Sequence, residues 1–106
     1  MKLSKVQEAV LNEAKTEIDK FRQYGSLDKY LETQMDWIEQ GGTEEDMESR
    51  KEYCERVYNE AVNGIVKIWR CNSKTIRKLE ELGLIEILFD SAGIRAGMDK
   101  IKVLGY

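Results

Sequence analysis

The stretch that decides the fold is CNSKTIRKLEELGLIEILFD, residues 71–90. Its start contains asparagine and serine, which favour a helix N-terminus, and its glycine favours the left-handed backbone that ends many helices. Ile76, Leu79 and Leu82 recur every three residues, so they predict one buried side on a short helix. The apolar run after the glycine is typical of a strand, which we expect over 84–89. This stretch therefore predicts a short helix that leads directly into a sheet.

Before this stretch, three ranges carry the helical spacing of apolar residues: 4–24, 26–40 and 43–63. Ser26 or Asp28 is suited to cap the second helix, and a Gln-Gly-Gly sequence stops it. Thr43, followed three residues later by Asp46, has the spacing of a variant capping box at the start of the third helix. An Asn-Gly pair ends that helix. The first part of the chain is therefore expected to be helical.

Beyond residue 63 the pattern becomes that of strands. The sequence GIVKIWR, residues 64–70, is rich in β-branched and aromatic residues and predicts one strand. A further strand is expected over 100–104, joined to strand 84–89 by a glycine-containing loop. This order predicts one α+β domain over residues 1–106, with N-terminal helices packed on a small antiparallel sheet.

The short helix that runs into a hairpin resembles the recognition helix and wing of winged helix-turn-helix proteins. The residues that carry this resemblance are Ser73, Thr75, Leu79, Gly83, Leu84 and Ile85. The hairpin, with Arg95 near its tip, is similar to the wing of MarR-like regulators. The resemblance covers roughly residues 64–106, which it implies to be winged-helix-like, and the helical part over 1–63 lies outside it. The chain departs from the family pattern at 64–70, where a strand is expected in place of the positioning helix.

The charge of the chain is unevenly distributed about a net value of −3. Residues 1–63 hold nine Lys and Arg against fifteen Asp and Glu, whereas residues 64–106 hold eight against five. A basic C-terminal part is suited to meet an anion, while the acidic part points elsewhere. Charges scattered over solvated faces are the alternative interpretation.

The residue types give catalysis little support. The chain has no histidine, which is the usual general base and the commonest metal ligand. Cys54 and Cys71 are too far apart for a Cys-x-x-Cys site, and reduced thiols are expected. The start of the chain has no secretory pattern and no window reaches the length of a membrane span. We therefore expect a non-enzymatic, cytoplasmic binding protein with no cofactor and no metal.

One candidate site is a nucleic-acid surface on the short helix and the wing. It comprises Asn72, Ser73, Lys74, Arg77, Lys78, Arg95 and Lys100. Arg77 is suited to read guanine, Lys74 and Lys78 to meet phosphates, and the first amides of the helix to bind one phosphate. The alternative is a solvated face in which Glu81 pairs with Lys74 or Lys78.

The other candidate site is a protein-binding surface on the N-terminal helices. It comprises Trp37, Glu44, Glu45, Asp46 and Glu48. Rows of carboxylates on a helix are able to occupy a basic groove, as phosphates do, and an exposed tryptophan is a common interface anchor. The alternatives are a favourable charge at a helix N-terminus and a tryptophan that covers the core.

Of the two functions, binding of double-stranded DNA for transcriptional regulation is favoured first, with a homodimer through the long helices as one arrangement. The second is a protein-binding inhibitor that acts on a basic nucleic-acid-binding protein. The chain, rich in lysine and glutamate, also resembles small accessory proteins of phages and prophages of Gram-positive bacteria. That resemblance implies a phage setting for either function, and for the inhibitor an anti-CRISPR or other anti-defence role.

Overall fold

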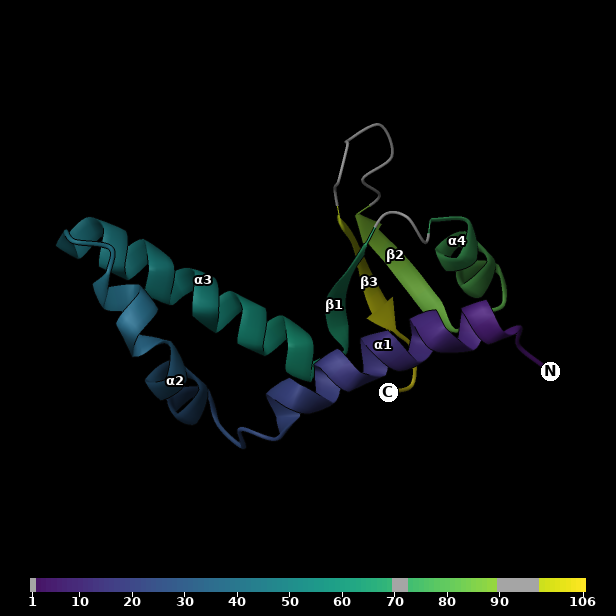
Figure 1. The fold of residues 1–106 in the computed structure, drawn as a ribbon, viewed down its shortest axis with the longest axis horizontal. Coiled ribbons are helices and arrows are strands. Elements are labelled where there is room, and N and C mark those ends of the chain that lie inside the picture. The colour runs from purple at the N-terminus through teal and green to yellow at the C-terminus, as the bar shows by residue number, and fades with distance from the viewer. Residues whose placement is uncertain (1, 70–72, 90–97) are drawn as a thin grey trace.

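The computed structural model describes residues 2–69, 73–89 and 98–106, and it has the expected α+β fold. Four helices and three strands follow one another in the order that the sequence predicts (Figure 1). In chain order they are α1 (Lys5–Arg22), α2 (Leu27–Glu39), α3 (Glu44–Val62), β1 (Ile65–Trp69), α4 (Ser73–Glu81), β2 (Ile85–Phe89) and β3 (Met98–Val103).

The helix starts are fixed by side chains within one turn. The hydroxyl oxygen of Ser26 accepts from the amide of Lys29, so the cap at Ser26 is confirmed. That of Thr43 accepts from the amide of Asp46, which confirms the Thr43 half of the expected capping box. For α4, the expected cap was Asn72 or Ser73. Ser73 is the first residue of the helix itself, and residue 72 lies outside the described residues.

The three strands form one antiparallel sheet in the order β1-β3-β2. The third strand begins two residues earlier than the sequence predicts, because Met98 and Asp99 continue the pairing with Trp69 and Ile68. Strand β3 is therefore the centre of the sheet, and β1 and β2 are its edges.

We call α1, α4 and the sheet the body, and the α2–α3 hairpin (residues 27–62) the arm. Helices α1 and α4 pack on one face of the sheet, which we call the inner face. The apolar residues that they bury together include Val10, Ala14, Ile68, Ile76 and Leu79. As expected, Leu79 is fully buried and joins α4 to α1, but Leu82 is only half-buried.

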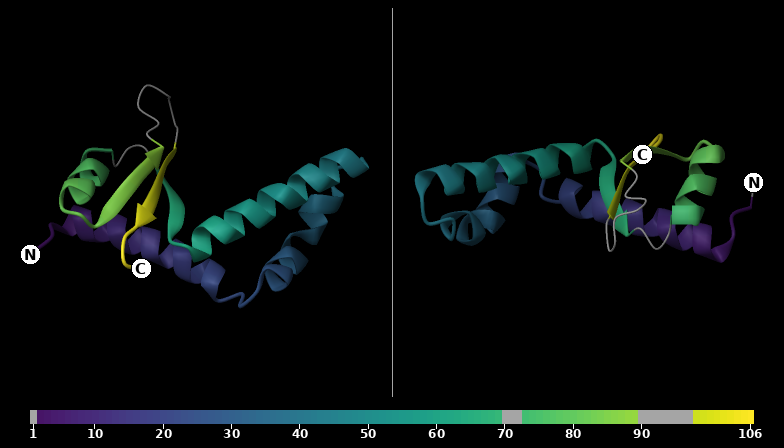
Figure 2. Two further views of the ribbon diagram at one scale, coloured as in Figure 1. Left: turned by 180° about the vertical axis from the view of Figure 1, so that it is seen from behind. Right: turned by 90° about the horizontal axis from the view of Figure 1, so that it is seen from above.

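The arm projects away from the body (Figures 1 and 2) and has a core of its own. That core contains Tyr30, Ile38, Cys54 and Tyr58, all buried. Phe21 of α1 packs against both cores, so one aromatic side chain connects the arm with the body. Within the described residues, no helix is both long enough and apolar enough to span a membrane.

Candidate functional site

The exposed side of α4 carries the cations that the sequence singled out. Lys74, Arg77 and Lys78 are exposed, while Ile76 and Leu79 are buried on the opposite side of the helix. Of the two ion pairs that the spacing allows, only Lys78 with Glu81 is formed, at 3.5 Å between exposed groups. Such a pair contributes about 0.2–1 kcal/mol, so it leaves Lys78 available for another anion.

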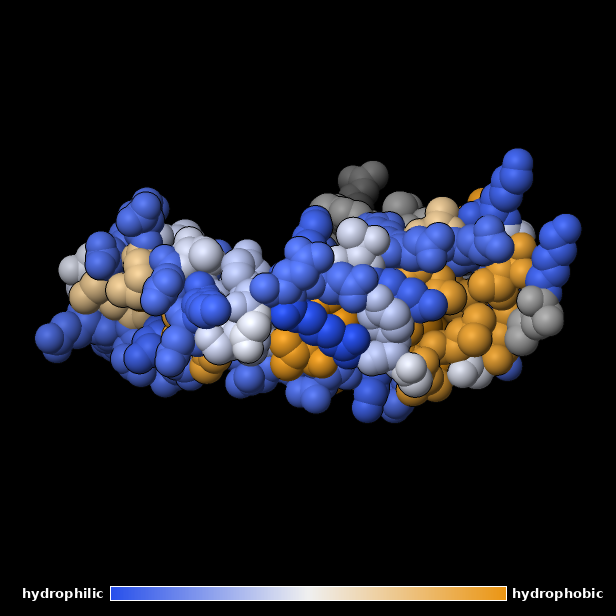
Figure 3. All heavy atoms as spheres, turned by 90° about the horizontal axis from the view of Figure 1, so that it is seen from below, coloured by the Kyte–Doolittle hydropathy of each residue, from blue (hydrophilic) through white to orange (hydrophobic). Residues whose placement is uncertain are grey.

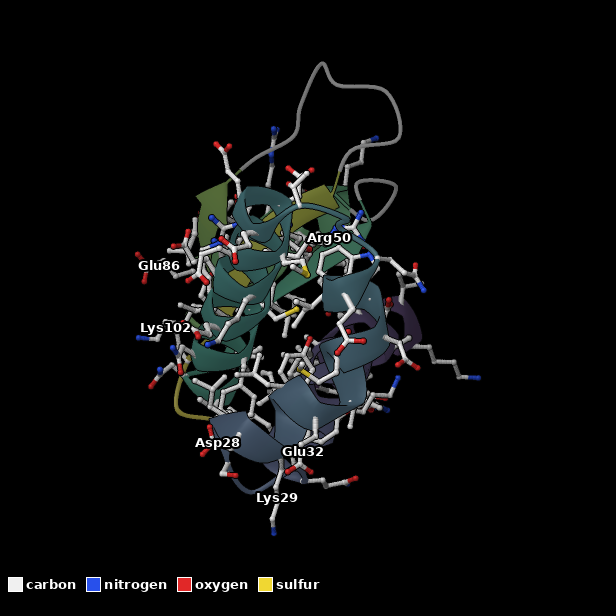
Figure 4. The ribbon with its side chains drawn as sticks, turned by 90° about the vertical axis from the view of Figure 1, so that its left-hand side faces the viewer. Asp28, Lys29, Glu32, Arg50, Glu86 and Lys102 are labelled. Atoms are coloured by element: carbon white, nitrogen blue, oxygen red, sulfur yellow. The ribbon has the colours of Figure 1, made fainter. Side chains whose placement is uncertain are left out.

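The sheet separates Lys100 from these three residues. Lys100 lies opposite Lys67 on the outer face of the sheet, which is the face turned away from α4. Its amino group forms an ion pair with Glu60 of α3. Lys102 and Glu86 face each other across β3 and β2 and project from the same side of the molecule (Figure 4). Lys100 and the exposed cations of α4 therefore lie on opposite sides of the sheet.

The rest of the expected DNA surface falls outside what the structure describes. Asn72 and Arg95 are not among the described residues, and Ser73 is described only as the first residue of α4. The structure therefore brings together Lys74, Arg77 and Lys78 from that set.

The acidic residues of the expected protein-binding surface lie close together at the end of the arm. Glu44, Glu45 and Asp46 form the first turn of α3, Glu48 follows in the second, and all four are exposed. The arm as a whole holds four Lys and Arg against eleven Asp and Glu, whereas the rest of the chain holds thirteen against nine. Asp28 and Glu32 also project from α2 in Figure 4. The charge asymmetry is thus sharper between arm and body than between the halves of the sequence.

Trp37 lies in a cluster with side chains that the sequence did not single out. Its ring is 6.0 Å from that of Tyr53, and the guanidinium of Arg50 lies over it at 4.9 Å. Arg50 also donates to the Trp37 carbonyl oxygen at 2.6 Å, and Arg56 lies over the Tyr53 ring at 5.4 Å. We call these four residues the aromatic–arginine cluster. Arg50, Tyr53 and Arg56 are spaced three residues apart on one helix, and this spacing indicates that their side chains are neighbours.

The cluster adjoins a cleft between the arm and the body. Tyr53, Val57 and Glu60 of α3 line the cleft from one side, and Ile65 and Lys67 of β1 line it from another. The cleft has a volume of about 220 Å³, and residues of α1 and β3 also line it. On the face seen in Figure 3, hydrophilic side chains cover most of the arm, whereas the body has an apolar patch.

The buried titratable groups of the arm, Tyr30 and Cys54, have raised pKa values that favour a role in packing over a role as reactive groups. Burial, followed by the nearby Cys54, Tyr24 and Tyr53, raises the pKa of Tyr30 to about 12. Burial also raises the pKa of the Cys54 thiol, which keeps it in the unreactive protonated form near neutral pH. Within the described part of the chain, no group of three or more acidic or cysteine side chains is arranged to hold a metal ion.

Comparison with known proteins assigns no function to these surfaces. No family model, curated protein or solved structure matches the chain. The winged-helix resemblance of residues 64–106 therefore stays a prediction, and function has to be argued from the charges and side chains of each surface.

Proposed function

We propose that the protein is a non-enzymatic binding module whose acidic arm docks on a basic surface of a partner protein. The observation that carries this proposal is the excess of acidic residues on the arm, which protrudes from a body of opposite net charge. Complementary charge speeds the encounter with such a partner and selects against others. A basic groove that normally holds nucleic acid is the surface that best fits a row of carboxylates.

Besides complementary charge, a docking surface needs side chains that bury apolar area on binding. The aromatic–arginine cluster supplies them. Trp37 and Tyr53 are 40% and 43% exposed, so they still have apolar surface to bury. Tryptophan, tyrosine and arginine are the residue types that most often dominate binding energy at protein interfaces. Because Arg50 and Arg56 already hold the rings in place, little side-chain freedom is lost on binding.

The same charge disfavours a homodimer through the long helices. Two arms packed side by side would bring together two helical pairs that are each strongly acidic. Like charges in close contact across an interface are destabilising. The arm is therefore better suited to a basic partner than to its own copy.

DNA binding by α4 is a second candidate, favoured by the three exposed cations Lys74, Arg77 and Lys78. A salt titration with a random 20-base-pair duplex separates the two functions. Three phosphate contacts predict that the logarithm of the binding constant falls against the logarithm of salt concentration with a slope of about −3. A module that docks through its acidic arm should show no duplex binding even at low salt.

The proposal itself is tested by charge reversal on the arm. Glu44→Lys with Glu45→Lys should abolish capture of partners from a lysate of cells that carry the gene. The matched control is Glu8→Lys with Glu13→Lys on α1, which changes the net charge equally at exposed positions. The arm pair has two first-turn residues and the control pair has one, so thermal melting should register about twice the helix-dipole loss in the arm variant, at about 0.3–1 kcal/mol per residue.

Purified partners recovered by the wild-type protein should then be displaced by duplex DNA in competition. Loss of capture in the arm variant alone supports the proposal. Equal capture by both variants, or wild-type duplex binding with the slope given above, rejects it in favour of α4.

A further inference from the structure

The two edges of the sheet differ in the partners of their outward backbone groups. The amide of Val103 donates to the Gly64 carbonyl oxygen, and the amide of Leu104 donates to the Leu84 carbonyl oxygen. Because bonded and non-bonded pairs alternate in an antiparallel ladder, the odd-numbered residues of β1 and of β2 turn their N–H and C=O groups away from β3. Ile65 and Lys67 thus present these groups at the β1 edge, and Ile85 and Ile87 present them at the β2 edge.

The β2 edge is occupied by a side chain of this protein. The amide of Ile87 donates to Oε2 of Glu80 on α4, at 2.7 Å. A carboxylate placed on an edge amide blocks the approach of another strand. At the β1 edge, the outward amides of Ile65 and Lys67 have no hydrogen bond within the described residues. The β1 edge is therefore the one that is free to take a further strand.

The cleft lies along this free edge. It is bounded by α1 and α3, which contribute Phe21, Tyr53 and Val57 as apolar walls. Helix α3 leaves the start of β1 at Gly64 and diverges from it, as both views in Figure 2 show. An added strand would occupy the space between them, with its side chains alternating between the outer face of the sheet, where Lys67 and Lys100 line the cleft, and the inner face.

The charges that line the cleft select the kind of strand. Glu17 is paired with Lys20 at 3.5 Å, and Glu60 is paired with Lys100. Lys67 is exposed and forms no ion pair within the described residues. Lys67 is therefore the cation that the free edge presents, and an acidic side chain beside it would be favoured as a cross-strand pair.

The same lysine disfavours a second copy of this chain at the edge. Pairing of β1 with its own copy, centred on Lys67, would place two lysines directly opposite each other. Like charges in that position are destabilising, and a lysine on an edge strand is a common device against self-pairing.

We propose that the free edge of β1 binds an extended acidic segment of a partner protein as a fourth strand of the sheet. The outward N–H and C=O groups of Ile65 and Lys67 hold its backbone. Lys67 pairs with an acidic side chain of the segment at the cleft, and the apolar side chains that alternate with it turn to the inner face. This binding mode is separate from docking through the arm and does not depend on it.

The probe for the test is an acetylated and amidated hexapeptide of alternating valine and glutamate. Titrated into the ¹⁵N-labelled protein, it should shift the amide resonances of Ile65 and Lys67 and slow their hydrogen exchange. The same peptide with lysine in place of glutamate should bind at least about tenfold more weakly, which corresponds to about 1.4 kcal/mol.

Two substitutions at one position separate the backbone from the charge. Lys67→Pro removes the outward N–H together with the charge and leaves the ladder with β3 intact, because proline is tolerated on the open side of an edge strand. Lys67→Thr removes the charge and keeps the N–H. We expect Lys67→Pro to abolish peptide binding and Lys67→Thr to weaken it about tenfold, with thermal melting of both to show that the fold is kept.

Reversal of the charge at position 67 is the last experiment. Lys67→Glu should reverse the preference, so that the lysine peptide binds better than the glutamate peptide. Equal binding by the proline and threonine variants, or shifts confined to the arm or α4, overturns the proposal. Concentration-dependent dimerisation that Lys67→Pro abolishes overturns it in favour of a second copy. The Glu44→Lys and Glu45→Lys variant should bind the peptide as the wild type does, which separates this result from the function of the arm.

Discussion

At the scale of single residues, Leu79 and Leu82 show how far a repeating pattern predicts burial. Both were expected inside, but only Leu79 is fully buried, since it lies under α1 while Leu82 stands just after the end of α4. The helix turns by about 100° per residue, so a spacing of three drifts around the helix and takes the third position away from the core. Leu79 is thus the stronger anchor of α4.

We expect Leu79→Ala to lower the free energy of unfolding by about 2–5 kcal/mol, through lost burial and the cavity that remains. Urea unfolding at constant temperature measures the change. Leu82→Ala is the matched control, because it removes the same atoms from a half-buried site. Equal losses for the two variants would contradict the packing of α4 on α1.

At the scale of elements, the junction between α3 and β1 depends on one glycine. Gly64 has a φ of +86°, which side chains other than glycine seldom adopt, and it ends α3 while starting the ladder with Val103. A β-carbon added there would lie 3.2 Å from the Val103 carbonyl oxygen. The glycine therefore permits both the turn and the close approach of the two strands.

Gly64→Ala should lower stability by more than the roughly 1–2 kcal/mol that left-handed backbone costs an ordinary residue. Gly25→Ala is the control for that cost, because Gly25 has a φ of +83° and open space around it. Chemical unfolding of both variants measures the difference. If Gly25→Ala lowers stability more than Gly64→Ala does, the close contact with Val103 does not add to the cost of a side chain at position 64.

The chain order of the elements also bears on the expected DNA-binding mode. Only residues 70–72 separate β1 from α4, which is less than one helical turn. No positioning helix fits between them, as the sequence pattern indicated. A DNA-binding role for α4 would therefore depend on α1, which packs against it, as the supporting helix.

At the scale of the whole molecule, the arm and the body have separate cores that are joined at the end of α3, where Ala61 is buried in the body core. Phe21 packs on both, and Arg22 donates from Nη2 to the carbonyl oxygens of Val62 and Tyr106, at 3.1 and 2.6 Å. The arm core is rich in tyrosine, whereas the buried residues of the body core include none. The two parts should therefore respond differently to high pH.

We expect the arm to lose stability as the pH rises from about 10 to about 12. Over this window unfolded Tyr30 releases its proton at the ordinary tyrosine pKa of 10.0, while the folded state keeps it until about 12. The unfolded state then binds fewer protons, so stability falls with pH, and the contribution of Tyr30 is complete below pH 10. Thermal melting followed by the methyl signals of Ile38, in the arm core, should show this loss.

Tyr30→Phe should flatten the pH dependence, because phenylalanine keeps the ring and has no proton to release. Tyr53→Phe, at an exposed site of the same arm, controls for the loss of one phenol. An unchanged slope in Tyr30→Phe would show that burial of this hydroxyl does not govern the arm at high pH.

The sequence by itself determined the local structure of this protein. Thr43 caps α3 and a glycine ends it, because each of these signals acts on atoms within about one helical turn. The α+β class followed from the change of period near residue 64.

Only the tertiary structure decided which charges share a surface. Lys100 was grouped with Lys74 on sequence, yet the sheet places it on the other face beside Glu60. Likewise Arg50 joins Trp37 across the arm, which no local pattern indicates. The physical reason is that the face of a sheet that becomes buried, and the pairing of helices, depend on apolar contacts between residues far apart in the chain.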